Sequence, residues 1–122
     1  MRQTASSGSV KAIWLDRAKA IEMIKAASLE AGSVFPEIKE IRLFGSLAKG
    51  EETGLSDIDL FILVDSQEKN PIERVRPYFL FFSEKLEAAL DIIAATSDEM
   101  DNFRDITKKS VLFYKKRDVT AK

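Results

Sequence analysis

Residues 41–65 read IRLFGSLAKGEETGLSDIDLFILVD, and this stretch decides the fold. The apolar run at 41–44 predicts a short buried strand that ends at Gly45 and Ser46. A glycine-containing turn follows, and DIDLFILVD then predicts a second strand. Beyond Asp59 both faces of this second strand are apolar, which is typical of a central strand covered on both sides.

The sequence on either side of this stretch predicts helices. Asp16 is a plausible N-cap for a first helix that ends near Gly32. Asn70 and Pro71 predict the start of another helix, because an N-cap residue is followed by proline at the first helical position. Aromatic residues recur at helical spacing within this second helix, and Phe79 and Phe82 are therefore expected in the core rather than in a base-stacking surface.

The last third of the chain predicts a strand, a helix and an edge strand. The segment LDIIAA is β-branched and short enough for a strand, although LEAALDIIA has no Gly or Pro break, so a helix running through Asp91 stays open. Residues 96–99 match a capping box and predict a last helix, and residues 111–114 predict a short edge strand. The resulting order predicts an α/β or α+β domain with a small mixed sheet flanked by helices.

Length and charge limit the possible classes of protein. The chain has 122 residues, which suits one domain over residues 11–122, preceded by a polar tail at 1–10. It has 19 Lys and Arg against 20 Asp and Glu, a net charge of -1 that gives no attraction toward nucleic acid or an anionic membrane. No targeting or membrane-spanning segment stands out, so a soluble cytoplasmic protein is expected.

The absence of two residue types restricts the chemistry further. The sequence contains no Cys and no His, which excludes thiol nucleophiles, zinc-thiolate sites and imidazole metal ligands. Any metal ion must therefore be bound by oxygen atoms. Oxygen ligation favours a hard ion such as Mg²⁺ or Mn²⁺.

Two carboxylates open the second predicted strand. Asp57 and Asp59 are two residues apart, so both side chains point to the same face. Like charges this close destabilise each other unless a cation lies between them. The arrangement suits two divalent ions about 3.5–4 Å apart, a geometry that promotes in-line displacement at phosphorus.

Each of these features also has a simpler interpretation. Gly45 and Ser46 could be only a strand-ending turn, and the two aspartates could be solvated residues at a strand start. Lys49 and Asp91 could be ordinary surface charges. The combination of the turn and both aspartates at this spacing favours a functional site over these alternatives.

The run GSLAKG followed by SDIDL resembles the polymerase-β-like nucleotidyltransferase superfamily. Within it the sequence is similar to the minimal nucleotidyltransferases (MNT), many of which act as antitoxins to HEPN-domain ribonucleases. The positions that match the family pattern are Gly45, Ser46, Gly50, Ser56, Asp57, Ile58, Asp59 and Leu60. The signature stretch that contains them covers about a fifth of the chain, and the order of elements fits along most of the rest.

This resemblance implies a nucleotidyltransferase fold, Mg²⁺ as cofactor, with two ions expected, and ATP as substrate. It implies that Asp57 and Asp59 hold the metal ions, and that Asp91 is the third catalytic carboxylate, which ligates a metal and helps deprotonate the acceptor. Gly45 and Ser46 would hold the terminal phosphates. The positions of Lys49 and Ser56 are also expected to contact the nucleotide; many relatives have Arg where this chain has Lys49, and lysine offers a point charge without the bidentate fork.

The expected activity is transfer of a nucleoside monophosphate, AMP from ATP, to a hydroxyl group. The resemblance implies that the acceptor is a tyrosine on a partner HEPN toxin, in a toxin–antitoxin pair. Two alternatives stay open: an inactive antitoxin that acts by binding alone, and a small-molecule transferase of the antibiotic-modifying type, for whose second domain the chain is short. A nucleic-acid acceptor is not expected, since Lys and Arg cluster only at 108–109 and 115–117.

Overall fold

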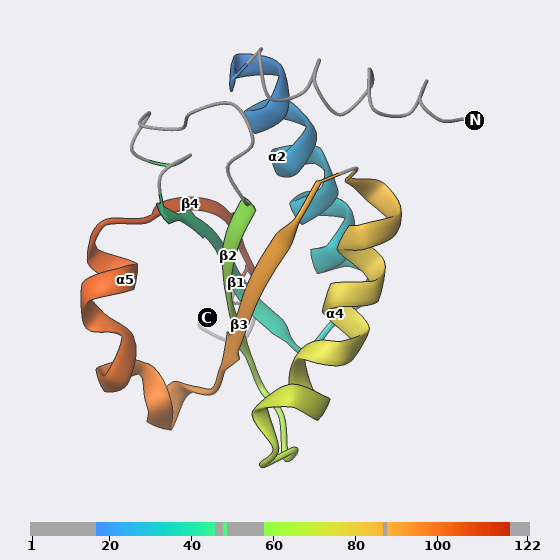
Figure 1. Cartoon of the computed structure of the whole chain (residues 1–122). Helices are drawn as coiled ribbons and strands as arrows, with labels where there is room; N and C mark the ends of the chain where they lie inside the picture. Colours follow the sequence, from blue (N-terminus) through green and yellow to red (C-terminus); the bar gives the residue numbers. More distant parts are fainter. Residues whose placement is uncertain (1–16, 46–47, 49–57, 87, 118–122) are drawn as a thin grey trace.

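A computed structural model describes residues 17–45, 48, 58–86 and 88–117 of the chain (Figure 1). In chain order, the elements are α2 (Arg17–Val34), β1 (Ile38–Phe44), β2 (Ile58–Val64), α4 (Pro71–Lys85), β3 (Leu90–Ala95), the 3-10 helix η1 (Ser97–Phe103), α5 (Arg104–Lys108) and β4 (Val111–Lys115). The predicted order of helices and strands is confirmed. The expected tail at 1–10 and the N-cap Asp16 lie outside the described residues.

The strands form one mixed sheet in the order β3-β2-β1-β4. Strand β1 runs antiparallel to β2 and β4, whereas β2 and β3 are parallel. Helices α2 and α4 cover one face of the sheet, and the segment of η1 and α5 lies against the other (Figure 1). The predicted fold class, a small mixed sheet flanked by helices, is therefore confirmed, and β4 is an edge strand as expected.

Alternation along β2 produces two separate cores. Ile58, Leu60 and Ile62 pack with α2 and α4 in the larger cluster. Phe61 and Leu63 point to the other face and pack with residues of η1 and α5. Because both sets are buried, β2 is the central, doubly covered strand that the sequence predicts.

The start of α4 is capped as predicted. The Asn70 side chain accepts a hydrogen bond from the backbone N–H of Ile72 at 2.9 Å, and Pro71 occupies the first turn. The helix ends at Lys85, and β3 begins at Leu90. Asp91 therefore lies on a strand, and the alternative of a helix through this position is excluded.

The expectation that both Phe79 and Phe82 belong to the core is half wrong. Phe82 is fully buried, but Phe79 keeps 41% of its surface exposed. The buried face of α4 is formed by Arg74, Tyr78 and Phe82, four residues apart, so Phe79 lies one step around the helix. The sequence analysis assigned Phe79 to the buried face because the first buried residue of α4 is Arg74, which an apolar pattern does not reveal.

The first helix was predicted to end near Gly32, and it ends two residues beyond this glycine. Helix α2 continues to Val34, so Gly32 lies inside it. A Cβ atom at Gly32 would come within 2.2 Å of Cζ in the ring of Tyr114 on β4. The glycine therefore allows an edge strand to pack closely on the helix rather than serving as a stop signal.

Replacement of Gly32 by Ala should lower the free energy of unfolding by about 1–3 kcal/mol, because the new methyl group overlaps the Tyr114 ring. The same replacement in a Tyr114→Ala background should instead stabilise the protein by up to about 1 kcal/mol, the helix-propensity gain of Ala over Gly. Urea unfolding of the four proteins measures both values. Destabilisation of equal size in both backgrounds would contradict the packing role.

A buried arginine ties three segments together. Arg74 donates from Nη1 to the carbonyl oxygen of Ala94 on β3 at 3.0 Å and to Oε1 of Glu99 at 2.8 Å. Its Nη2 and Nε donate to the carbonyl oxygen of Glu68, at 2.6 Å and 2.9 Å. The Glu99 carboxylate also accepts the backbone N–H of Thr96 at 3.1 Å, which completes the predicted start of the last helical segment.

The Arg74–Glu99 pair should make stability depend on pH in the acid range. The hydrogen bond from Arg74, followed by that from the Thr96 backbone, holds the pKa of Glu99 below its ordinary value of 4.5. A lowered folded-state pKa stabilises the protein above the unfolded pKa, and this stabilisation is lost as pH falls through the folded value.

Glu99→Gln should therefore lower the free energy of unfolding by about 1 kcal/mol at pH 7. The value is modest because the Glu99 side chain is 35% exposed. The difference from wild type should shrink as pH falls below about 5. Urea unfolding at pH 7, 5 and 3.5 tests this, and a difference that stays constant over the series would show that the ion pair contributes nothing.

No helix among the described residues combines the length and the apolar character needed to cross a membrane.

Candidate functional site

Gly45 and Asp59 meet where β1 ends and β2 begins. Gly45 follows Phe44, the last residue of β1, and has φ +80, a left-handed conformation that side-chain-bearing residues rarely adopt. A Cβ atom at Gly45 would lie 2.1 Å from Oδ2 of Asp59. Glycine is therefore required here for two reasons, its φ angle and the closeness of a carboxylate.

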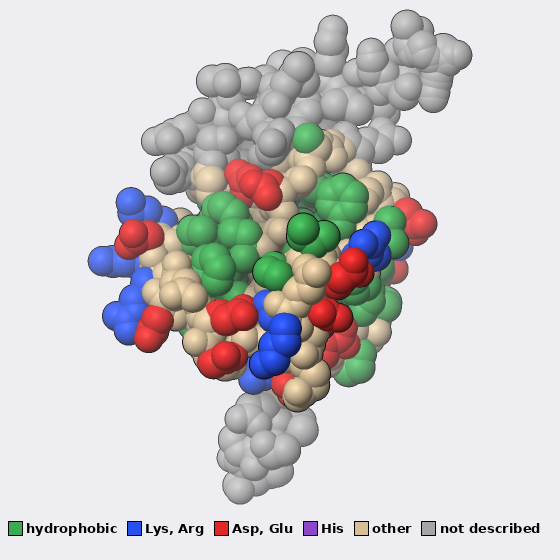
Figure 2. Space-filling view, turned by 60° about the horizontal axis from the view of Figure 1, so that its bottom comes forward, with side chains coloured by type: hydrophobic (Ala, Val, Ile, Leu, Met, Phe, Trp, Pro, Cys, Tyr) green, Lys and Arg blue, Asp and Glu red, His purple; other side chains and the backbone are tan. Residues whose placement is uncertain are grey.

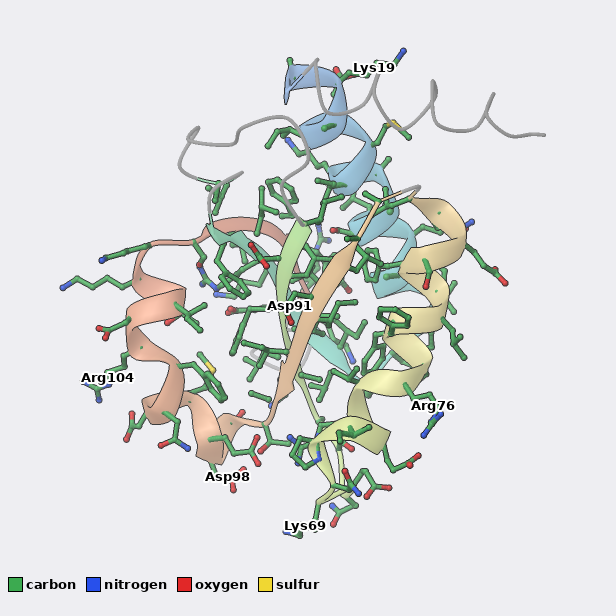
Figure 3. All side chains as sticks on the ribbon, viewed as in Figure 1. Lys19, Lys69, Arg76, Asp91, Asp98 and Arg104 are labelled. Atoms are coloured by element: carbon green, nitrogen blue, oxygen red, sulfur yellow. The ribbon has the colours of Figure 1, made fainter. Side chains whose placement is uncertain are left out.

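Asp59 and Asp91 are direct neighbours across two parallel strands. They are Cα partners in the β2–β3 ladder, so their side chains leave the sheet on the same face. Adjacent strands are about 4.8 Å apart, which places both carboxylates at one spot on the sheet. Asp59 is half-buried and Asp91 is exposed. The label of Asp91 in Figure 3 marks this spot on β3.

This spot lies at the edge of the smaller core. Phe44 pairs with Asp59 in the β1–β2 ladder and packs with Phe61 and Phe103 on the face covered by η1. Apolar neighbours raise the cost of two like charges, because they reduce solvation of the carboxylates. A divalent cation would offset that cost, and oxygen-only donors suit Mg²⁺. The residues present therefore fit the ion that the sequence implies.

The structure brings together three of the seven predicted site residues, Gly45, Asp59 and Asp91. The other four, Ser46, Lys49, Ser56 and Asp57, lie outside the described residues, and their roles stay predictions. Among the described residues no group of three acidic side chains forms a metal site, as expected when only two of the three predicted carboxylates are in view.

Sequence reasoning missed one residue that supports this site. Arg74 holds the carbonyl oxygen of Ala94, which lies on the same strand as Asp91. The signal was present in the sequence, because Arg74 precedes Tyr78 and Phe82 at four-residue spacing. An arginine on an apolar stripe indicates a buried ion pair or a carbonyl contact.

Comparison with known proteins identifies the family and agrees with the fold. The family model described as "Polymerase beta, Nucleotidyltransferase" matches residues 30–118, which is most of the chain. A search of curated proteins found no match. Among solved structures, a Sulfolobus solfataricus protein described provisionally as a nucleotidyltransferase is 28% identical, covers 82% of this chain and 84% of its own, and has a TM-score of 0.62.

A second solved structure is a mutant of the toxin–antitoxin pair MntA–HepT, in which two aspartates two positions apart are changed to glutamate. The matching chain is 17% identical to this one, the match covers 84% of this chain and 75% of the other, and the TM-score is 0.51. This second likeness concerns the fold alone. The family match and the fold together show that the chain belongs to the polymerase-β nucleotidyltransferase family.

Proposed function

We propose that this protein transfers AMP from ATP to a hydroxyl group in a Mg²⁺-dependent reaction. The observation that supports it most is the convergence of Gly45, Asp59 and Asp91 at one point of the sheet, from three different strands or strand ends. Paired carboxylates suit metal ions that promote in-line displacement at phosphorus, and a glycine beside them lets a phosphate group approach the backbone closely. The family to which the chain belongs performs chemistry of this class.

Each predicted residue has a role in this proposal. Asp57 and Asp59 hold the metal ions, and Asp91 completes the set. Bound Mg²⁺ would neutralise the phosphate charge and stabilise the leaving pyrophosphate. The acceptor oxygen bonds to the α-phosphorus, the bond from that phosphorus to the bridging oxygen of the β-phosphate breaks, and the acceptor proton passes to a carboxylate oxygen of Asp91.

The nucleotide phosphates are held on the other side of the site. Gly45 and Ser46 accommodate the β- and γ-phosphates, where the absence of a side chain at Gly45 allows close approach of the backbone. Lys49 supplies a point charge, and Ser56 a hydroxyl next to the metal site. These contacts orient the triphosphate so that the pyrophosphate group faces away from the acceptor.

The acceptor in this proposal is a tyrosine of a HEPN-type toxin, with this protein as its antitoxin. The fold resembles that of a chain in the mutant MntA–HepT toxin–antitoxin structure. A macromolecular partner would then supply the other wall of the site, and the protein should copurify with it. Bulk RNA and aminoglycosides should not be modified.

Two labels on ATP test the reaction directly. The protein, coexpressed with the protein encoded beside it, should transfer label from [α-³²P]ATP but not from [γ-³²P]ATP, and EDTA should abolish the transfer. Label from the γ-position would indicate a kinase and would contradict the proposal. A binding-only antitoxin would neutralise its toxin with neither label transferred, and labelled RNA 3′ ends would indicate a nucleic-acid acceptor.

A further inference from the structure

The outer edge of β3 carries backbone groups that point away from the sheet. The N–H of Ile58 donates to the carbonyl oxygen of Ala89 at 2.9 Å, which fixes the phase of the parallel β2–β3 ladder. In a parallel ladder, alternate residues direct both backbone groups toward the neighbouring strand. Leu90, Ile92 and Ala94 therefore direct theirs outward, and the bond from Arg74 to the Ala94 carbonyl oxygen confirms this phase.

Most of this outer edge is unpaired in the described part of the chain. Arg74 accounts for the Ala94 carbonyl, and no other described residue bonds to the outward groups of Ile92. Strand β3 ends the sheet, because the strand order is β3-β2-β1-β4. An unpaired row of this kind is a template for a further strand.

An apolar groove of about 510 Å³ runs along this edge. The start of α4 forms one wall with Pro71, Ile72 and Val75, and η1 forms the other with Asn102 and Phe103; the Arg74–Glu99 ion pair also lines the groove. Ile92 and Ile93 of β3 are the floor. Figure 2 shows apolar side chains gathered in groups on this side of the molecule, with charged side chains around them. The two walls cover opposite faces of the sheet, so the groove lies where the sheet itself would continue.

We infer that this groove binds an extended segment of the partner protein, which adds to β3 as a fifth strand. An extended segment satisfies the outward N–H and C=O of Ile92, whereas a helix has no free backbone groups to offer. Successive side chains of the segment would point to opposite faces, so apolar residues of one alternate set would contact Ile72 and those of the other set Phe103.

The groove begins one residue from Asp91, and this continuity identifies the segment. This step rests on the proposed function: the bound strand is the part of the partner that carries the acceptor hydroxyl. Asp91 and Ile93 share one face of β3, about 6.6 Å apart along the strand. The segment should therefore have its hydroxyl side chain beside Asp91 and an apolar side chain two positions away, beside Ile93.

A matched pair of variants on α4 tests the groove. Ile72 and Leu80 are both exposed, at 73% and 58%, but only Ile72 lines the groove. The probe is a fluorescein-labelled peptide, Lys-Val-Val-Tyr-Val-Val-Lys, which presents Tyr and two Val side chains to the Asp91 face and two Val side chains to the Ile72 face; binding is measured by fluorescence anisotropy. Ile72→Glu should weaken binding at least about tenfold, because a carboxylate would be buried against the peptide, while Leu80→Glu should change it less than about twofold.

Backbone methylation of the same peptide tests the strand geometry. Alternate amides of an added strand face β3, so N-methylation of one alternate set should abolish binding and N-methylation of the other set should not. Equal effects of the two methylated peptides, equal effects of the two Glu variants, or no binding up to about 1 mM would each overturn the inference.

Label transfer to the peptide separates this inference from the proposed function. With [α-³²P]ATP and Mg²⁺, Ile72→Glu should raise KM for the peptide and leave KM for ATP unchanged. Labelling of the peptide that ignores Ile72 would overturn the groove and leave the transferase standing. A different result would be peptide binding that depends on Ile72 without labelling of the peptide or of any protein partner. The groove would then still bind peptides, but both its role in acceptor binding and the proposed transferase activity would be refuted.

Discussion

Asp59→Asn is expected to lower the rate of AMP transfer by at least about 100-fold, with the fold intact. The substitution keeps the shape of the side chain but removes the negative charge next to Asp91 on the neighbouring strand. A site that relies on metal binding and on stabilising charge at the transition state cannot tolerate that loss. Single-turnover transfer from [α-³²P]ATP measures the effect.

Asp65→Asn is the matched control for this experiment. Asp65 follows the last residue of β2, at the opposite end of the same strand, and its side chain is exposed. Its replacement should leave the transfer rate unchanged. Both variants should show the circular dichroism spectrum of the wild type. If Asp59→Asn transfers AMP at the rate of Asp65→Asn, the assignment of the site is wrong.

The same variant separates a transferase from a protein that acts by binding. A binding-only antitoxin should still protect cells from its toxin after Asp59→Asn, since the side chain keeps its volume. An antitoxin that acts by modification should lose protection in parallel with the transfer rate. The two outcomes are read from growth of cells that coexpress the partner toxin.

The parts of the fold that were predictable depend on local patterns. Alternation along β2 assigned each face correctly, because a strand in the middle of a sheet must be apolar on both sides. Asn70 predicted the start of α4, since the cap is formed by its own side chain and two backbone N–H groups just downstream. Neither inference needs knowledge of distant residues.

Other features could not be predicted from local patterns, because they depend on contact between distant parts of the chain. Gly32 looks like a helix stop, but the close approach of Tyr114, 82 residues later, explains it. The strand through Asp91 was predicted, but a helix there stayed open because no Gly or Pro precedes it; pairing of β3 with β2 excludes that alternative. Tertiary contacts override local propensity at such positions.

The candidate site combines both kinds of information. Spacing alone placed Asp59 at the start of a strand, and the family resemblance pointed to Asp91. Their pairing in register could not be derived from spacing, because it depends on where a crossover of about 25 residues returns the chain to the sheet. The contact between Gly45 and the Asp59 carboxylate likewise appears only when two strands are aligned.

Gly45→Ala should reduce transfer about 100-fold and lower the free energy of unfolding by about 1–2 kcal/mol. The stability loss comes from φ +80, which costs any residue with a Cβ atom, and the activity loss comes from displacement of the Asp59 carboxylate, since Oδ2 lies 2.1 Å from the position of the new methyl group. A shift of about 1 Å in a catalytic group is enough for an effect of this size.

Gly45→Asn separates the two causes. Asparagine tolerates a left-handed backbone better than alanine, so it should restore part of the lost stability. It has the same Cβ atom against Asp59, however, and should lower the transfer rate as much as alanine does. Thermal unfolding and single-turnover transfer, measured on both variants, give the two quantities. If asparagine recovers the rate together with the stability, backbone strain rather than the position of the Asp59 carboxylate explains why glycine is needed where β1 ends.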